Sequence, residues 1–152
     1  MDIFDNDPAR HATRRSARHG AEWFFIAAIL SVINSLIVYF FGVGNMPIAF
    51  GVTQWIDGTS GPATAHHLTP PLNILPLIGN ILIAIAVAGF GYFARKGNDV
   101  AFATGIFLYT IDAMLAMFLR DFWGFAVHLV ILFFLCKGLL ASRHVRENAT
   151  SI

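Results

Sequence analysis

Residues 110–128 read TIDAMLAMFLRDFWGFAVH, and this stretch places two ionisable side chains within apolar sequence. Asp112 lies in the apolar run 100–119 and His128 lies in the run 122–141, with a break of two polar residues between the runs. Two apolar runs joined by so short a break predict two antiparallel helices that cross a membrane together. A charge near the middle of a bilayer costs at least ~3 kcal/mol, so such side chains usually face other helices or water, and they often mark function.

The composition of the chain excludes a soluble globular protein. Of its 152 residues, 57% are hydrophobic and 12% are charged, and the mean hydropathy is +0.66. This leaves too little polar surface for a soluble fold and predicts a polytopic membrane protein. The single cysteine, Cys136, lies in an apolar run, which excludes an internal disulfide and argues against thiolate zinc chemistry. We expect the lipid bilayer as a partner, together with a second copy or another membrane protein, and no nucleic acid.

Four apolar runs are long enough to cross ~30 Å of hydrocarbon as helices. They predict an all-α fold, a polytopic transmembrane four-helix bundle, with spans at residues 23–43, 72–94, 100–119 and 122–141. The transmembrane domain is therefore expected to cover residues 23–141.

The front of the chain, residues 1–22, is a basic segment in which Arg10, Arg14 and Arg18 recur every four residues. A helix over this segment would place the three guanidinium groups on one side, where each would gain ~1 kcal/mol from anionic headgroups. The alternative is a disordered, positively charged tail that only sets the orientation of the protein. We favour the disordered tail.

The predicted connection between spans one and two, residues 44–71, contains no Lys or Arg. Within it, residues 47–56 are rich in apolar side chains but are too few to cross a bilayer. They predict a short interfacial or re-entrant helix, because their apolar side chains would otherwise be left in water. Such a helix would bring Gln54 and Asp57 against the bundle as possible contributors to a site.

The distribution of cations predicts the orientation. Nine of the ten Lys and Arg residues fall on one side of the four-span arrangement, and Arg120 alone falls on the other. By the positive-inside rule, both termini are expected in the cytoplasm, with residues 142–152 as a cytoplasmic tail. The protein is thus predicted to be a multi-pass protein of the cell membrane, with residues 44–71 on the outer side.

Each predicted span carries one strongly polar side chain, and these lie at similar depth. At 1.5 Å per residue, Asn34, Asn80, Asp112 and His128 lie roughly 9 to 13 Å from the outer ends of their helices. All four lie on stripes of small residues, which line helix contacts in membranes. We expect them to converge in the outer half of the bundle, with Asp112 and His128 within reach of a hydrogen bond or one water. Tyr109, one turn before Asp112, belongs to the same candidate site.

Two classes of function fit this polar layer. In the first, the layer handles a proton, a cation or a small ligand, as in a small transporter or a proton-coupled component. In the second, the protein is an accessory or assembly subunit of a larger membrane complex, and the layer is a structural hydrogen-bond lock whose bonds contribute ~0.6 kcal/mol each on average. The sequence identifies no cofactor for either class.

A third hypothesis is an intramembrane metal- or serine-dependent enzyme, and we weigh it less. A catalytic zinc site normally has three protein ligands, so His66, His67 or Asp57 would have to join Asp112 and His128. Residues 58–61 read GTSG, which has the G-x-S-G form of rhomboid serine proteases. Rhomboids carry six spans against the four expected here, so no metal ligand set and no catalytic residue is assigned.

A broader resemblance covers most of the chain. It rests on residues 23–34, on GVTQWIDG at residues 51–58, and on Tyr109-x-x-Asp112 followed by Asp121 and His128. These segments resemble small bacterial integral membrane proteins of four spans. The resemblance implies the fold and no activity. We expect a bacterial inner membrane as the location.

Overall fold

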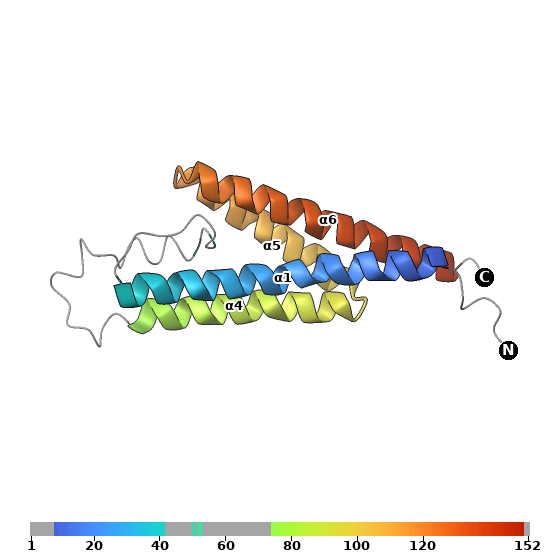
Figure 1. Ribbon diagram of the computed structural model, residues 1–152, viewed down its shortest axis with the longest axis horizontal. Coiled ribbons are helices and arrows are strands. Elements are labelled where there is room, and N and C mark those ends of the chain that lie inside the picture. The colour runs from blue at the N-terminus through green and yellow to red at the C-terminus, as the bar shows by residue number, and fades with distance from the viewer. Residues whose placement is uncertain (1–7, 42–49, 51, 53–73, 151–152) are drawn as a thin grey trace.

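The computed structural model of the chain describes residues 8–41, 50, 52 and 74–150, and its helices form a bundle (Figure 1). In chain order they are α1 (Pro8–Phe41), α4 (Ile74–Arg95), α5 (Asp99–Phe118) and α6 (Phe122–Thr150). All four are long and apolar enough to cross a membrane. The prediction of an all-helical fold with four helices suited to span a membrane is confirmed for the described residues, which include no strand.

The helices run alternately up and down, which gives the bundle two distinct ends. We call the end where α1 stops and α4 starts the loop end, and it also holds the turn between α5 and α6 (Figure 1). The opposite end, called the terminal end, holds the start of α1, the end of α6 and the turn between α4 and α5. α1 packs against α4 and α6, and α5 packs against the same two helices. Toward the loop end, α5 and α6 diverge from α1 and α4 (Figure 1).

The middle of the bundle is built around Phe24 of α1, whose side chain is 1% exposed. Its ring meets the ring of Phe102 on α5 edge to face, with the centroids 5.6 Å apart. Glycines on the neighbouring helices make room for it. A Cβ atom at Gly91 would lie 2.9 Å from Phe24 Cβ, and one at Gly105 would lie 2.7 Å from the Phe24 ring. Glycines thus let α4 and α5 approach one aromatic side chain of α1, as expected for packing in a membrane.

The stripes of small and polar residues predicted to face inward are buried, and large apolar side chains lie on the outside. The buried members include Ala27, Ser31, Asn80, Ala84, Gly91, Gly105, Ala116, Gly124 and Gly138. Leucine, isoleucine and phenylalanine side chains such as Leu82, Ile85 and Phe107 are more than 60% exposed. An apolar exterior around a small-residue interior is the arrangement that a lipid environment favours.

Side-chain caps start both helices of the second hairpin. Asn98 Oδ1 accepts a hydrogen bond from Ala101 N at the start of α5, at 3.0 Å, after Gly97 has reversed the chain with a φ of 81°. Asp121 Oδ1 accepts from Gly124 N at 2.8 Å at the start of α6. Arg120, just before this cap, has a φ of 61°, an uncommon conformation for a residue with a side chain. The result is a very short turn that fixes α5 and α6 side by side.

The disordered tail that we favoured for the front of the chain is wrong for residues 8–22. α1 begins at Pro8, a residue suited to the first position of a helix, and continues without a break into the first span. Its polar part is supported by α6, because Gly20 and Gly138 bring the two backbones into contact. α6 likewise continues to Thr150, beyond the predicted boundary at residue 141. Arg14 and Arg18, two of the three arginines that recur every four residues, line one pocket.

The predicted interfacial helix at residues 47–56 lies outside the described residues, apart from Phe50 and Val52. Phe50 is 3% exposed, and both residues belong to the packing around Tyr109. These two positions are therefore placed against α5 at the loop end.

Candidate functional site

Asp112 and His128 face each other across the hairpin of α5 and α6. His128 lies on the second turn of α6, and its Nε2 is 3.0 Å from Asp112 Oδ2. The imidazole side chain is 1% exposed and the carboxyl side chain 10% exposed, so the pair is enclosed near the loop end of the bundle. The expected proximity of the two side chains is what the structure shows.

The backbone of α6 fixes which ring nitrogen of His128 carries a proton. His128 Nδ1 lies 2.7 Å from the carbonyl oxygen of Gly124, one turn earlier. A carbonyl oxygen accepts hydrogen bonds and never donates them, so Nδ1 is the donor in this bond. The protonation of Nε2 is therefore the variable one, and Nε2 is the atom that faces Asp112.

The contact between His128 Nε2 and Asp112 Oδ2 is satisfied by one proton. Without a proton, two lone pairs would face each other at 3.0 Å. With a proton on each atom, one of two donors would lack its acceptor. A single shared proton satisfies both atoms whether it resides on nitrogen or on oxygen, because one atom then donates and the other accepts. One proton between the two atoms therefore completes this hydrogen bond.

The second oxygen of Asp112 holds the segment that follows α1. Val52 N donates a hydrogen bond of 2.9 Å to Asp112 Oδ1. Next to it, the buried ring of Phe50 meets the ring of Tyr109 edge to face, with the centroids 5.9 Å apart. One carboxyl group therefore joins three parts of the chain, namely α5, α6 and the segment at Val52.

Tyr109 contributes to the site through its ring. It is 4% exposed, and it stacks on the imidazole of His128 with the centroids 5.1 Å apart and the planes 24° from parallel. Its described contacts, with His128 and with Phe50, are ring packing. The tyrosine ring shields one face of the imidazole from water and limits the rotation of the imidazole.

The two asparagines of the predicted layer belong to the other hairpin. Asn80 Nδ2 on α4 donates a hydrogen bond of 3.0 Å to Ser35 Oγ on α1. Asn34 is the neighbour of Ser35 in sequence, and Asn34, Asn80 and Ser35 are each at most 2% exposed. Of the four polar residues expected to converge, Asp112 contacts His128, whereas Asn80 contacts Ser35 of α1, which was not among the predicted site residues.

Several contributors were not among the predicted site residues. Ser35 and Ser31 lie on the inward stripe of α1 and are fully buried, so their place on that stripe was the available signal. Ser31 Oγ is buried without a hydrogen-bond partner among the described residues. The carbonyl of Gly124 and the N–H of Val52 are backbone groups. Their roles leave no mark in the residue type, so sequence reasoning had no means of finding them.

The other predicted contributors lie outside the described residues. These are Gln54 and Asp57, and the same holds for Ser60, His66 and His67 of the enzyme hypothesis. Within the described part of the chain, no three His, Cys, Asp or Glu side chains are grouped as a metal ion would need.

Comparisons with known proteins give no family for this chain: no family model, no curated protein and no solved structure matches it.

Proposed function

We propose that the protein is a multi-pass protein of the cell membrane that binds and releases a proton at the pair Asp112–His128. The observation that carries the proposal is the pair of contacts made by the imidazole, 2.7 Å to the Gly124 carbonyl and 3.0 Å to the carboxyl of Asp112. The first contact fixes one ring proton, and the second leaves one proton to be shared with a carboxyl group. Histidine and carboxyl groups inside membrane helices commonly form proton relays.

The exposure of the pair supports entry of the proton from the loop end. The carboxyl of Asp112 is 10% exposed, whereas the imidazole is 1% exposed and stacked on Tyr109. A proton arriving from the loop end would meet Asp112 first and pass to Nε2 along the existing hydrogen bond. In the proposed orientation the loop end faces the outside and both termini are cytoplasmic, because the cations gather at the terminal end.

The Val52 contact supports a coupling between the proton and the segment after α1. Asp112 Oδ1 accepts the N–H of Val52 at 2.9 Å, and a charged carboxylate is the stronger acceptor for this bond. Movement of the shared proton between oxygen and nitrogen therefore changes how firmly that segment is held. This is the property that a proton-coupled transporter or a pH-responsive component requires.

A second candidate function is that of an accessory subunit in which the buried polar contacts only lock the helices. The bond between Asn80 and Ser35 favours it, because neither an amide nor a hydroxyl exchanges a proton near neutral pH. The two candidates therefore differ in the role of the acid and imidazole pair alone.

Infrared spectroscopy of the chain in lipid bilayers separates the two candidates. We expect acidification to produce a carboxyl C=O band in the wild-type chain and in Asp99→Asn, and the band of Asp112 to be absent from Asp112→Asn. Asp99→Asn is the matched control, because Asp99 also accepts two side-chain hydrogen bonds on α5. If Asp112→Asn folds and gives the same difference spectrum as the wild-type chain, Asp112 does not titrate and the lock is the better account.

A further inference from the structure

A pocket at the terminal end of the bundle gathers positive charge from three parts of the chain. It has a volume of about 390 Å³ and lies between the start of α1, the turn after α4 and the end of α6. Its described lining includes one carboxylate, Asp99, and five permanent cations, Arg14, Arg18, Arg95, Lys96 and Arg146. Five positive charges against one negative charge leave a net charge of +4 in a small volume.

Asp99 is already engaged within the protein. Its Oδ1 accepts a hydrogen bond of 2.6 Å from Ser142 Oγ, and its Oδ2 accepts one of 3.5 Å from Arg146. The remaining cations line the same pocket, and a bound anion would offset the repulsion among their like charges. The charge of the pocket therefore fits a ligand with several negatively charged oxygens, of which a phosphate group is the simplest.

Two aromatic contacts place these cations at the boundary between apolar and polar sequence. The guanidinium of Arg95 lies over the ring of Phe25, 5.9 Å from its centroid, and Lys96 Nζ lies 4.4 Å from the centroid of the Tyr92 ring. Both rings belong to candidate membrane spans, and both cations come at the end of one. This is the depth of the phosphate groups of a bilayer, and basic pockets between membrane helices commonly bind lipid headgroups.

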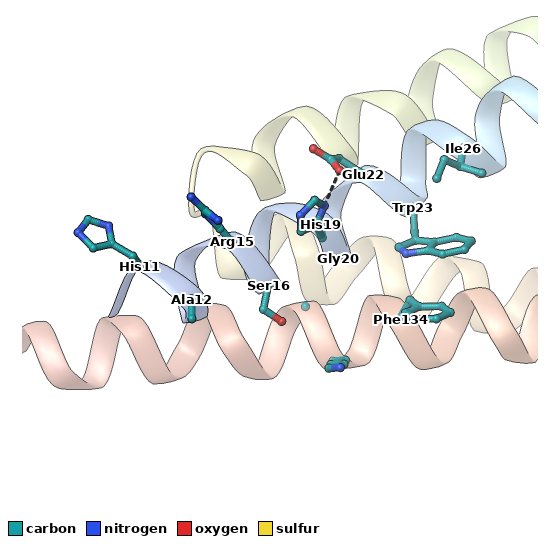
Figure 2. Close-up of a pocket in the computed structure, with 12 residues that line it drawn as sticks. His11, Ala12, Arg15, Ser16, His19, Gly20, Glu22, Trp23, Ile26 and Phe134 are labelled. Atoms are coloured by element: carbon teal, nitrogen blue, oxygen red, sulfur yellow. Dashed lines mark hydrogen bonds and ion pairs between the residues drawn. The ribbon is translucent and has the colours of Figure 1, made fainter. Parts of the chain in front are cut away.

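A second pocket at the terminal end allows the net charges of two pockets to be compared. It is larger, about 1130 Å³, and Figure 2 shows it between α1 and α6, beside the stacked rings of Trp23 and Phe134. Its permanent cations are Arg15 and Lys137, and it also contains Glu22, which lies 3.0 Å from His19 (Figure 2). With the histidines counted as neutral its net charge is +1, so the smaller pocket is the stronger attractor of anions.

We propose that the pocket lined by Arg14, Arg18, Arg95, Lys96 and Arg146 binds the phosphate headgroup of an anionic phospholipid. The bilayer holds such phosphates at the level of the pocket, so the headgroup would reach these side chains while its acyl chains stay among the apolar helix faces. The proposal is independent of the proton site, which lies at the other end of the bundle.

Lipid binding to the purified full chain in a neutral detergent tests the proposal. The probes are phosphatidylglycerol, phosphatidylcholine and inorganic phosphate, with bound lipid counted by native mass spectrometry and stabilisation measured as a shift in Tm. We expect phosphatidylglycerol to bind and to raise Tm, with much smaller effects from the other two. Equal effects of the two lipids would overturn the proposal, as would a shift with inorganic phosphate as large as that with phosphatidylglycerol, which would mark a site for soluble anions.

Matched variants locate the binding. Arg14→Gln/Arg18→Gln removes two charges from the proposed pocket, and Arg15→Gln/Lys137→Gln removes two charges from the larger pocket at the same end. We expect the first double variant to bind phosphatidylglycerol at least tenfold more weakly and the second to bind as the wild-type chain does. Lys96→Gln/Arg146→Gln gives an independent reading if the first variant does not fold. Equal weakening by both pockets' variants would show diffuse attraction and would contradict a specific site.

Discussion

Two aspartates on α5 each join this helix to α6, and they do so with different chemistry. Asp99, at the terminal end, accepts hydrogen bonds from Ser142 and from Arg146, whose side chain is 71% exposed. Asp112, near the loop end, contacts His128, whose side chain is 1% exposed. One helix pair is thus held at both ends by a carboxyl group.

The difference lies in what the partners can do with a proton. A hydroxyl and a guanidinium keep their protons over the whole range in which proteins are folded, so the Asp99 contact has one arrangement. An imidazole nitrogen and a carboxyl oxygen can each hold the proton that lies between them, so their shared bond has two arrangements. The comparison suggests that the terminal end of the hairpin is fixed and that the loop end can change.

The largest effect that we expect is in membrane topology, with the loop end and the terminal end of the bundle on opposite sides of the membrane. A reporter fused at residue 64 and one fused at residue 151 should report opposite compartments, with residue 151 in the cytoplasm, because nine of ten cations gather at the terminal end. Paired fusions of an alkaline phosphatase and a fluorescent protein at each position measure this. Activity in the same compartment at both positions would require an even number of spans between them, and it would exclude the three spans expected there.

The next largest effect is expected when the imidazole of His128 is removed. His128→Ala should lower the free energy of unfolding by about 3 kcal/mol, because it leaves the carboxyl of Asp112 buried without its partner. Ser142→Ala, the matched change at the other aspartate, should cost about 1 kcal/mol, since Arg146 remains. Reversible unfolding in mixed micelles measures both. Equal losses in the free energy of unfolding for His128→Ala and Ser142→Ala would contradict the expected difference between the two aspartate contacts.

A smaller effect is expected where the segment after α1 meets the hairpin. Phe50→Ala removes a buried ring from Tyr109 and should loosen the segment that Val52 anchors on Asp112. In a Cys136→Ser background, a cysteine introduced at Val52 should then react about tenfold faster with a polar thiol reagent, which corresponds to ~1.4 kcal/mol of lost protection. An unchanged rate would show that the Asp112 contact alone holds this segment.

The smallest effect concerns the carboxyl at the terminal end. Asp99→Asn keeps the shape of the side chain and weakens its bonds to Ser142 and to the exposed Arg146. Exposed ion pairs contribute between 0 and about 1 kcal/mol, so we expect a loss of that size in the free energy of unfolding. Salt should reduce the difference further. A loss as large as that of His128→Ala would contradict the assignment of this contact as the weaker one.

The sequence predicted the parts of this arrangement that depend on residue type and spacing. Helical rise placed Asp112 and His128 at one level, and the short break at Arg120 and Asp121 required their helices to be neighbours. The small-residue stripes gave the inward faces, because side chains without bulk allow close approach in a membrane. These rules depend on residue type and on spacing along the sequence, so they apply without knowledge of how distant segments pack.

What the sequence did not predict depends on contacts between distant segments. Residues 8–22 look like a polar tail by composition, yet they continue α1 because Gly20 meets Gly138 of α6. The pairing of Asn80 with Ser35 required the relative rotation of two helices, which equal depth does not give. The N–H of Val52 and the carbonyl of Gly124 act through the backbone, so their part in the site has no sequence signature.

The protonation of His128 in lipid bilayers tests the central claim most directly. Nitrogen-15 spectra of the imidazole, assigned by difference from His128→Gln, should show Nδ1 protonated at every pH at which the protein is folded. The protonation of Nε2 should change with pH, and its titration should move in Asp112→Asn while staying the same in Asp99→Asn. An Nε2 that keeps one protonation state throughout, or that titrates identically without the Asp112 carboxyl, would contradict a proton shared between these two side chains.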